Sequence, residues 1–324
     1  MIRFNVFFAT MLVLALSTDA RAVTINWSPV GNPGNAAETA TGLGAVGYSY
    51  NIGTYDVTNA QYVEFLNAKD PSGADPLGLY HHEPSQDTFL GISFNAGGVN
   101  GSKYNIVAGR ANQPVSSVSW YNAARFANWI NNGQGNGDTE TGAYTLEGGT
   151  PAPTNGLTVT RNPAARVFLP TVDEWNKAGF YNSATGSYFQ YATSSNTLPS
   201  AVAPPGSSNS ANWHYAVNHP TDVGAYTASP SPYGTFDQAG NIIQWTESFS
   251  HDSFRIMRGA PYSVDSASFF TTSVLLTDLP QNLNSSEGFR LASVAGVPEP
   301  SAFALAAFGF AGLAVWSWRR WNRR

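Results

Sequence analysis

The sequence predicts a loop-rich domain with a real hydrophobic core, in which short strand-like and helical segments alternate. Three observations lead to this prediction. The chain of 324 residues has few charged residues (11%) but many glycines (31) and aromatic residues (13%), a composition that favours a folded, loop-rich chain over disorder. Helix-start motifs follow strand-like stretches at separate places in the chain. Apolar runs stand at both ends, outside the region where these motifs occur.

The first structural unit combines a strand with a helix. Residues 46–57 alternate loosely between apolar and polar side chains, as strands do. Thr58 and Gln61 then form a capping box, in which each side chain bonds a backbone amide of the other. Phe65 and Leu66 follow at helical spacing, so we expect this helix to turn them toward the core.

Two further helices are predicted. Ser119 is the expected N-cap of a helix that begins at Trp120. Thr171 and Glu174 form a second capping box, after which Trp175 is expected to point inward. Residues 182–235 are dominated by Ser, Asn, Pro and Gly, and we interpret them as surface loops within the same domain.

The N-terminus has the three parts of a secretory signal. Arg3 is the positive end, the run 6–16 is apolar but short for a membrane span, and Ala20 and Ala22 frame a small-x-small cleavage site. We therefore predict a signal peptide over residues 1–22 and an exported mature chain.

The C-terminus carries a second apolar run, from Ala302 to Trp318, of 17 uncharged residues. That length is near the lower limit for a helix that crosses a bilayer, so a transmembrane helix is predicted at about 302–318. Four arginines follow directly, and by the positive-inside rule they would stay in the cytoplasm while the body lies outside. These arginines are Arg319, Arg320, Arg323 and Arg324.

A short motif, Pro298, Glu299 and Pro300, stands just before this run. Pro-Glu-Pro, an apolar span and a terminal arginine cluster together resemble the PEP-CTERM sorting signal of exopolysaccharide-producing Gram-negative bacteria. The resemblance assigns residues 298–324 to this signal and implies an exosortase-type enzyme as a partner. It further implies a temporary membrane anchor through the C-terminal helix, followed by placement at the cell surface or outside the cell.

The body between the two signals, residues 23–297, is acidic and has no cysteine. Removing the ends takes away six of the 16 Lys and Arg residues and two of the 21 Asp and Glu residues, which leaves a net charge of −9. Such a surface repels nucleic acid, so nucleic acid is not an expected partner. Disulfides, thiol nucleophiles and cysteine metal sites are all excluded. An exported loop-rich fold without disulfides commonly relies on another staple, such as calcium.

Six motifs, in order, resemble those of the formylglycine-generating, sulfatase-modifying family. The first, for example, reads Y-D-V-T-N-A-Q-Y here where the family pattern is Y-E-V-T-N-x-Q-Y. The six stretches are Tyr55–Phe65, Pro114–Ala123, Phe168–Trp175, Gly234–Trp245, Arg255–Tyr262 and Gly288–Arg290. The resemblance covers about residues 45–293 and implies one α+β domain, the family's variant of the C-type-lectin fold, over residues 23–297.

The oxidase chemistry of that family does not carry over to these residues. Its enzymes bind copper through two cysteines that lie between the last two motifs. The matching segment here, Pro261–Glu287, has no Cys, His or Met, and serine cannot replace a thiolate for Cu(I). Ala260 also stands where the family has glycine. We therefore expect no copper and lean toward a protein that is not an enzyme. Iron-dependent sulfoxide synthases share the domain, but they draw their histidines from a second domain, for which this chain leaves no room.

Calcium is the cofactor that the resemblance does imply. Family members bind it in the loop matching Gly234–Trp245, and the positions that correspond here are Asp237, Gly240, Ile242 and Gln244. Gln244 stands where the family has glutamate, and the lost charge should weaken binding. A second family site would begin at Asn212 and the Trp213 carbonyl. The alternative is a simple turn in which Asp237 bonds local backbone amides.

Three functional hypotheses follow. The first is a non-catalytic exported module that binds a ligand of the cell envelope or exopolysaccharide matrix, or structures that matrix. The second is a divergent enzyme of the formylglycine-generating, oxidoreductase family with a cysteine-free site. The third is a purely structural matrix protein.

Arg290, in the last motif, is expected to be structural, a buried guanidinium that ties loops together.

Overall fold

The computed structural model describes residues 22–81, 91–251 and 253–296. The apolar part of the predicted signal peptide with Ala20, the sorting motif and the predicted transmembrane segment lie outside these residues. Within the ranges that are described, no helix combines the length and the apolar character that crossing a membrane would require.

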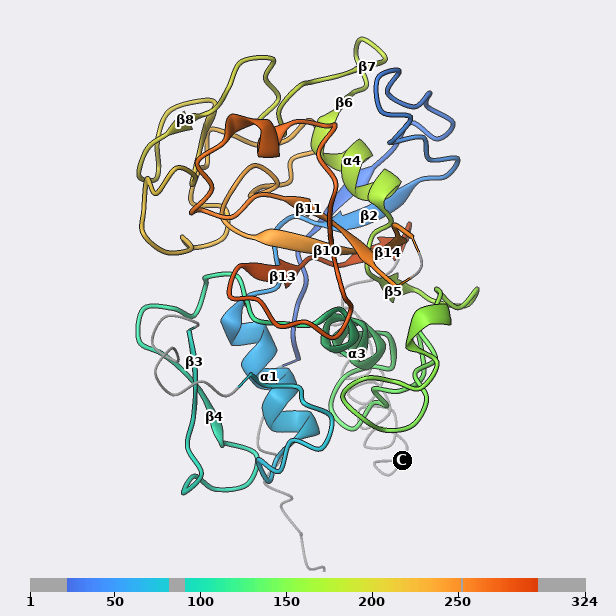
Figure 1. Ribbon diagram of the computed structural model, residues 1–324, viewed down its shortest axis with the longest axis vertical. Coiled ribbons are helices and arrows are strands. Elements are labelled where there is room, and N and C mark those ends of the chain that lie inside the picture. Colours follow the sequence, from blue (N-terminus) through green and yellow to red (C-terminus); the bar gives the residue numbers. More distant parts are fainter. Residues whose placement is uncertain (1–21, 82–90, 252, 297–324) are drawn as a thin grey trace, which may run out of the picture.

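Two four-stranded sheets form the centre of the molecule (Figure 1). The first has the order β1-β2-β14-β5 and the second the order β12-β11-β10-β13. The strands of the first sheet are β1 (Trp27–Val30), β2 (Tyr50–Gly53), β14 (Ala292–Val294) and β5 (Val167–Phe168). Those of the second are β12 (Leu276–Asp278), β11 (Arg255–Gly259), β10 (Ile243–Phe249) and β13 (Glu287–Phe289). Because β13 and β14 follow each other in the chain, the two sheets are joined by a link of only two residues, Arg290 and Leu291.

In the described part of the chain three α-helices flank the sheets, and Figure 1 shows α1 and α3 on one side with α4 on the other. They are α1 (Asn59–Lys69), α3 (Trp120–Asn131) and α4 (Val172–Phe180). The predicted starts are confirmed: Thr58 and Thr171 are N-caps with complete capping boxes, and the Ser119 side chain accepts from the Asn122 amide. Local sequence chemistry therefore fixes where each helix begins.

The main core lies between α1, α3 and the two sheets. Phe126 of α3 packs on Phe65 of α1 and on Phe289 of β13, with ring centroids 5.4 Å apart in both pairs. Helix α3 is buried from Trp120 to Trp129, on nearly all sides and not on one face alone. A smaller core gathers around Trp175 and Phe180 of α4. Most of the fold thus rests on aromatic packing near its helices.

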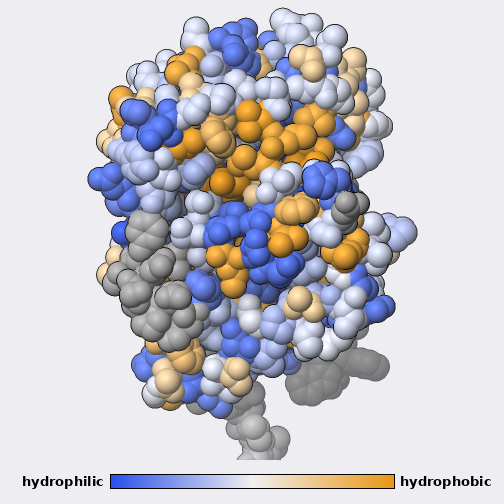
Figure 2. Space-filling view, in the orientation of Figure 1, coloured by the Kyte–Doolittle hydropathy of each residue, from blue (hydrophilic) through white to orange (hydrophobic). Residues whose placement is uncertain are grey.

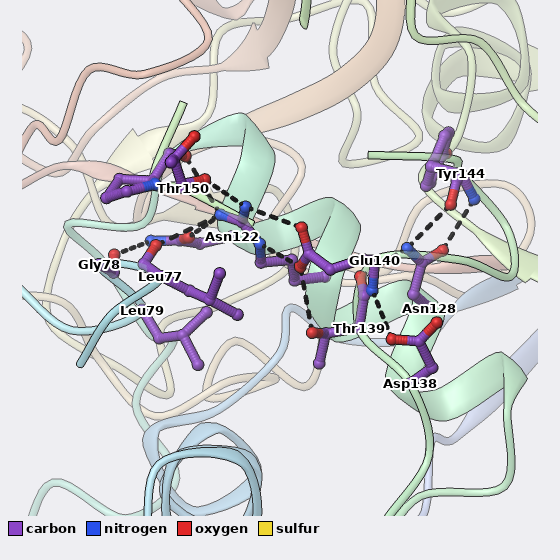
Figure 3. A network of polar contacts seen from close by, with 12 residues as sticks. Leu77, Gly78, Leu79, Asn122, Asn128, Asp138, Thr139, Glu140, Tyr144 and Thr150 are labelled. Carbon is purple, nitrogen blue, oxygen red and sulfur yellow. Dashed lines mark hydrogen bonds and ion pairs between the residues drawn. The ribbon is translucent and has the colours of Figure 1, made fainter. Parts of the chain in front are cut away.

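Polar side chains of α3 hold the loops that surround it (Figure 3). Arg125, fully buried, forms an ion pair with Glu140 at 2.8 Å and donates to the Thr150 carbonyl at 2.7 Å. Asn128 donates to the Thr139 carbonyl and accepts from the Tyr144 amide, both at 2.7 Å. These bonds satisfy buried backbone groups that a loop cannot satisfy by itself.

Regular structure is sparse outside this centre, as the composition predicts. The remaining strands are short pairs: β3 (Ile92–Phe94) with β4 (Tyr104–Ile106), β6 (Tyr181–Asn182) with β7 (Ser187–Tyr188), and β8 (Ser200–Ala201) with β9 (Ser210–Ala211). Single 3₁₀ turns occur at η1 (Gly156–Thr158) and η2 (Ala267–Phe270). The predicted loop character of residues 182–235 is confirmed.

The first predicted strand is shorter than expected. Residues 46–57 were expected to be extended throughout, whereas β2 contains only Tyr50–Gly53. The chain leaves the sheet after Gly53, whose amide donates to the Leu291 carbonyl at 2.7 Å. Asp56 then turns into the interior to meet Arg290. The alternating apolar residues are therefore buried both before and after the point where the chain leaves the sheet. They do not belong to one continuous strand.

Arg290 lies in the link between the sheets and bonds to both of them. Its guanidinium is fully buried and donates to the Gly53 carbonyl of β2 at 2.9 Å and to Gln244 Oε1 of β10 at 2.6 Å. It also donates to the Phe236 carbonyl at 2.7 Å and pairs with Asp56 Oδ1 at 3.1 Å. The prediction that this arginine ties loops together is confirmed.

Replacing Arg290 by methionine should destabilise the protein by roughly 3–5 kcal/mol, because the Asp56 carboxyl and the Gly53 and Phe236 carbonyls would remain buried without their donor. The measurement is urea-induced unfolding followed by tryptophan fluorescence. Arg166→Met, at an exposed arginine, is the control and should change the free energy of unfolding by less than about 0.5 kcal/mol. Equal effects of the two substitutions would contradict the role given to Arg290.

Candidate functional site

The loop predicted to hold calcium lies directly beside the Arg290 cluster, which consists of Arg290 and its partners Gly53, Asp56, Phe236 and Gln244. Asp237 has a left-handed backbone (φ 61°), and its Oδ2 accepts from the Gly224 amide at 2.6 Å. Gln244 Nε2 donates to the Asp237 carbonyl at 3.0 Å. Asp237 therefore accepts from a backbone amide 13 residues away in another loop, and not from the local amides of the turn alternative, while its own carbonyl is also occupied.

Gln244 is completely used by its protein neighbours. Its Oε1 accepts from Trp175 Nε1 at 2.7 Å and from Arg290 Nε at 2.6 Å, which occupies both lone pairs. A cation at this position would have to displace these donors and approach the positive guanidinium. In this arrangement Gln244 Oε1 has no lone pair left for a calcium ion, while Gly240 and Ile242 lie in the same stretch of chain.

The second predicted position offers one free oxygen. Asn212 is buried, its Nδ2 donates to the His219 carbonyl at 3.0 Å, and its Oδ1 has no hydrogen-bond partner. The Trp213 carbonyl, however, accepts from the Ala216 amide at 2.9 Å. The fold does bring the two predicted positions together, since the Asn241 amide donates to the Asn212 carbonyl at 2.9 Å. Among the described residues no group of three His, Cys, Asp or Glu side chains is placed to hold a metal.

The segment Pro261–Glu287, which corresponds to the copper-binding segment of the family's enzymes, has two different halves. The first half packs on the smaller core: Phe270 is buried against Trp213 with ring centroids 5.0 Å apart. Apolar side chains continue along it to Leu275, which is 43% exposed. Figure 2 shows apolar surface gathered in this upper central region, where the chain from η2 to β12 crosses the sheet. This half of the segment presents apolar and hydroxyl groups and no ligand suited to copper.

A cleft of about 490 Å³ lies on the other side of the Arg290 cluster, a volume within the range of small-ligand sites. It is lined by Tyr55, Asp56, Gln61, Asn112 and Asp222, together with apolar side chains such as Leu291. Tyr55 is partly exposed, and its ring stacks on Phe236 with centroids 5.7 Å apart. The cleft thus combines an aromatic face with amide and carboxylate groups.

Asp56 gives this cleft its main electrostatic feature. Its Oδ1 pairs with Arg290, but its buried Oδ2 has no hydrogen-bond partner. Burial raises the pKa of Asp56 to about 7, against the opposing effect of Arg290. Asp56 is not among the site residues predicted from the sequence, although a signal was available: the family motif has glutamate at this position and the chain has the shorter aspartate.

The titration of Asp237 makes stability depend on pH. Burial raises the pKa of this carboxyl from 3.8 to about 6, while the Gly224 amide and Arg290 act in the opposite direction. The folded chain therefore holds the proton more tightly than the unfolded chain. The resulting stabilisation is complete below the unfolded pKa of 3.8 and is lost as pH rises through 6.

Asp237→Asn should make the protein less sensitive to pH, because asparagine is neutral, tolerates the left-handed backbone and still accepts from Gly224. Between about pH 5 and pH 8 the free energy of unfolding should fall on the order of 1 kcal/mol less in the variant than in the wild type. Urea titrations at both pH values measure this difference, with the exposed Asp222→Asn as control. An unchanged pH dependence in Asp237→Asn would contradict the assignment.

Comparison with known proteins agrees with this architecture. The model of the sulfatase-modifying factor enzyme 1-like domain matches residues 34–295, and that of the PEP-CTERM protein-sorting motif matches residues 296–320. Hercynine oxygenase of Mycolicibacterium smegmatis is 25% identical over 203 residues. That match covers 62% of this chain and 37% of the oxygenase, so the chain spans well under half the length of this relative.

Two solved structures share the fold. Treponema denticola variable protein 1 superposes with a TM-score of 0.55 and 17% identity, over 85% of this chain and 97% of that protein. The crystal structure of CarF gives a TM-score of 0.52 and 18% identity, over 84% of this chain and 97% of CarF. Since the family match extends over most of the chain and includes all six motifs, the protein belongs to the sulfatase-modifying factor enzyme 1-like domain family and carries a PEP-CTERM sorting motif.

Proposed function

We propose that this protein is an exported, non-catalytic binding module, which an exosortase-type enzyme places at the cell surface or in the exopolysaccharide matrix. The family domain and the sorting motif support the exported, sorted part of this proposal. In the proposal, the predicted segment 302–318 holds the chain in the membrane until the tail is processed near Pro298, Glu299 and Pro300.

One observation carries the non-catalytic part. Between Pro261 and Glu287, where the copper-dependent relatives hold their metal, the chain has no thiol, imidazole or thioether. Cu(I) is a soft ion that selects such ligands, and hydroxyl or aliphatic side chains do not replace them. Phe270 is moreover buried in the smaller core, so the first half of this segment is used for packing.

The cleft beside Arg290 is the proposed binding site. Sugars are recognised by aromatic faces combined with planar polar groups, and the cleft provides Tyr55 together with the side chains of Asn112, Gln61 and Asp222. The charge-poor composition and the excess of acidic residues favour a neutral ligand over an anionic one. We therefore assign a neutral oligosaccharide segment of the surrounding matrix to this cleft.

The second candidate is a divergent oxidoreductase with a cysteine-free site. The similarity to hercynine oxygenase is the observation that favours it. It would require redox chemistry from residues other than thiols, and the chain covers only 37% of that enzyme. Oxygen consumption by the full-length protein, assayed with Cu(I) or Fe(II) and a cysteine-containing peptide, separates the two candidates: turnover would support the enzyme and contradict the binding module.

Binding should be visible with a panel of neutral and acidic oligosaccharides, measured by isothermal titration calorimetry on the full-length chain. Tyr55→Ala should weaken binding of a neutral oligosaccharide by about tenfold, because the stacking face is lost. Tyr215→Ala is the matched control, since Tyr215 is 52% exposed and does not line the cleft. Asn112→Ala provides a second test that leaves the Tyr55 and Phe236 stack in place. Equal affinity in all three variants, or no binding by the wild type, would contradict the assignment of the cleft.

A further inference from the structure

The second half of the segment Pro261–Glu287 contains a cluster of polar side chains that neither the six family motifs nor the cleft accounts for. Four oxygen-bearing side chains converge where β12 ends and β13 begins. They are Asp278, Asn282, Asn284 and Glu287, within ten residues of chain. Asn282 Nδ2 and Asn284 Nδ2 each donate to the Asp278 carboxylate at 2.6 Å, and Asn284 Nδ2 also donates to Glu287 Oε1 at 2.9 Å. One amide nitrogen therefore contacts both carboxylates, which places them close together.

Glu287 is the unusual member of this cluster. Its side chain is 4% exposed, and its buried Oε2 has no hydrogen-bond partner. A buried carboxylate oxygen without a donor is costly, and native structures rarely leave one unexplained. Asn284 Nδ2 contacts both carboxylates, so the two acids lie close together, and burial and the neighbouring Asp278 both raise the pKa of Glu287. None of the ion pairs among the described residues includes either acid.

The cluster is open to solvent on one side. Asn284 is exposed and Asp278 is partly exposed, so an ion and its water ligands can reach the Asp278 carboxylate from this side. The backbone around it is anchored: the Asn284 carbonyl accepts from the Ser117 amide at 3.2 Å, and the Glu287 carbonyl accepts from the Val118 amide at 3.3 Å. The side chains are thus held against the start of α3 on a loop of fixed course.

We propose that Asp278, Asn282, Asn284 and Glu287 form a calcium site in the loop between β12 and β13. Two carboxylates and two amide oxygens, completed by water, provide the six to eight oxygen ligands that calcium takes. The Nδ2 atoms of Asn282 and Asn284, which donate to the carboxylates, occupy the position in which the calcium ion would bind. Rotating each terminal amide by half a turn presents Oδ1 to the ion instead, a change that requires almost no movement of other atoms.

The chemistry of the ligands selects the ion. All four donors are oxygen atoms, and the whole segment from Pro261 to Glu287 lacks the Cys and His side chains that zinc or copper prefer. Magnesium demands near-octahedral geometry and retains its water, whereas calcium accepts irregular loops such as this one. The site is separate from Asn212 and Asp237, which lie in the preceding loops of the chain.

An ion here would fasten the two outer strands of the second sheet. In the strand order β12-β11-β10-β13, Asp278 ends one outer strand and Glu287 begins the other. A ligand that binds only the folded state stabilises it in proportion to its concentration above the dissociation constant. The loop would thereby gain from calcium the constraint that a disulfide gives to other exported domains, which this cysteine-free chain cannot form.

Calorimetric titration of the chelator-treated full-length chain with calcium chloride tests the site, with thermal melts in calcium and in chelator as the second readout. We expect one equivalent of calcium to bind with a dissociation constant of roughly 10⁻⁵ to 10⁻³ M, more tightly than magnesium, and to raise the melting temperature. Glu287→Gln and Asp278→Asn should each weaken binding by at least about tenfold. The control Asp265→Asn, at an exposed acid of the same segment, should bind as the wild type does.

Two results would overturn the proposal. Calcium binding that persists unchanged in both Glu287→Gln and Asp278→Asn would place the ion elsewhere, for example at Asn212. A wild type that ignores calcium while Glu287→Gln raises its melting temperature in chelator would show that the two acids simply share one proton. Because both substitutions are isosteric and Asp278 is partly exposed, at least one variant should remain folded for the comparison.

Discussion

The buried guanidinium of Arg290 is the contact on which the arrangement of this molecule depends. It lies in the two-residue link between the sheets and bonds to Gly53 of one and to Gln244 of the other. Its charge is balanced by Asp56, which belongs to the turn leading into α1. One side chain therefore makes hydrogen bonds to both sheets, to the turn before α1 and to Phe236 next to the 237–244 loop. The cleft on one side and the Asp237 turn on the other both derive their shape from it.

Other buried polar side chains extend the same principle through a fold with little regular structure. Arg125 and Asn128 hold loops around α3, and Arg255 packs on the Trp120 ring 3.7 Å from its centroid. Each supplies several donors in a fixed geometry, so that one residue satisfies backbone carbonyls from distant loops. This mode of construction is suited to a chain without cysteines, because buried polar clusters, with the calcium ion that we propose, can perform the role of disulfides.

The sequence predicts those features that depend on local chemistry. The capping boxes at Thr58 and Thr171 mark helix starts correctly, since they require only side chains within one turn. Strand extent is predicted less well: β2 ends at Gly53 because of a tertiary contact that alternation cannot reveal. For the same reason the cleft was missed, since its walls come from segments far apart in the chain. The cluster of Asp278, Asn282, Asn284 and Glu287 was detectable in part, because these four residues lie within ten positions of one another in the sequence.

We propose that this member of the family has a cation-stabilised binding scaffold in place of thiol-based redox chemistry. Metal analysis by mass spectrometry on the full-length protein, purified without chelators, tests it most directly. We expect calcium near one equivalent per chain, with copper and iron at background. Stoichiometric copper or iron would contradict it and would place a redox centre in a chain that has no cysteine.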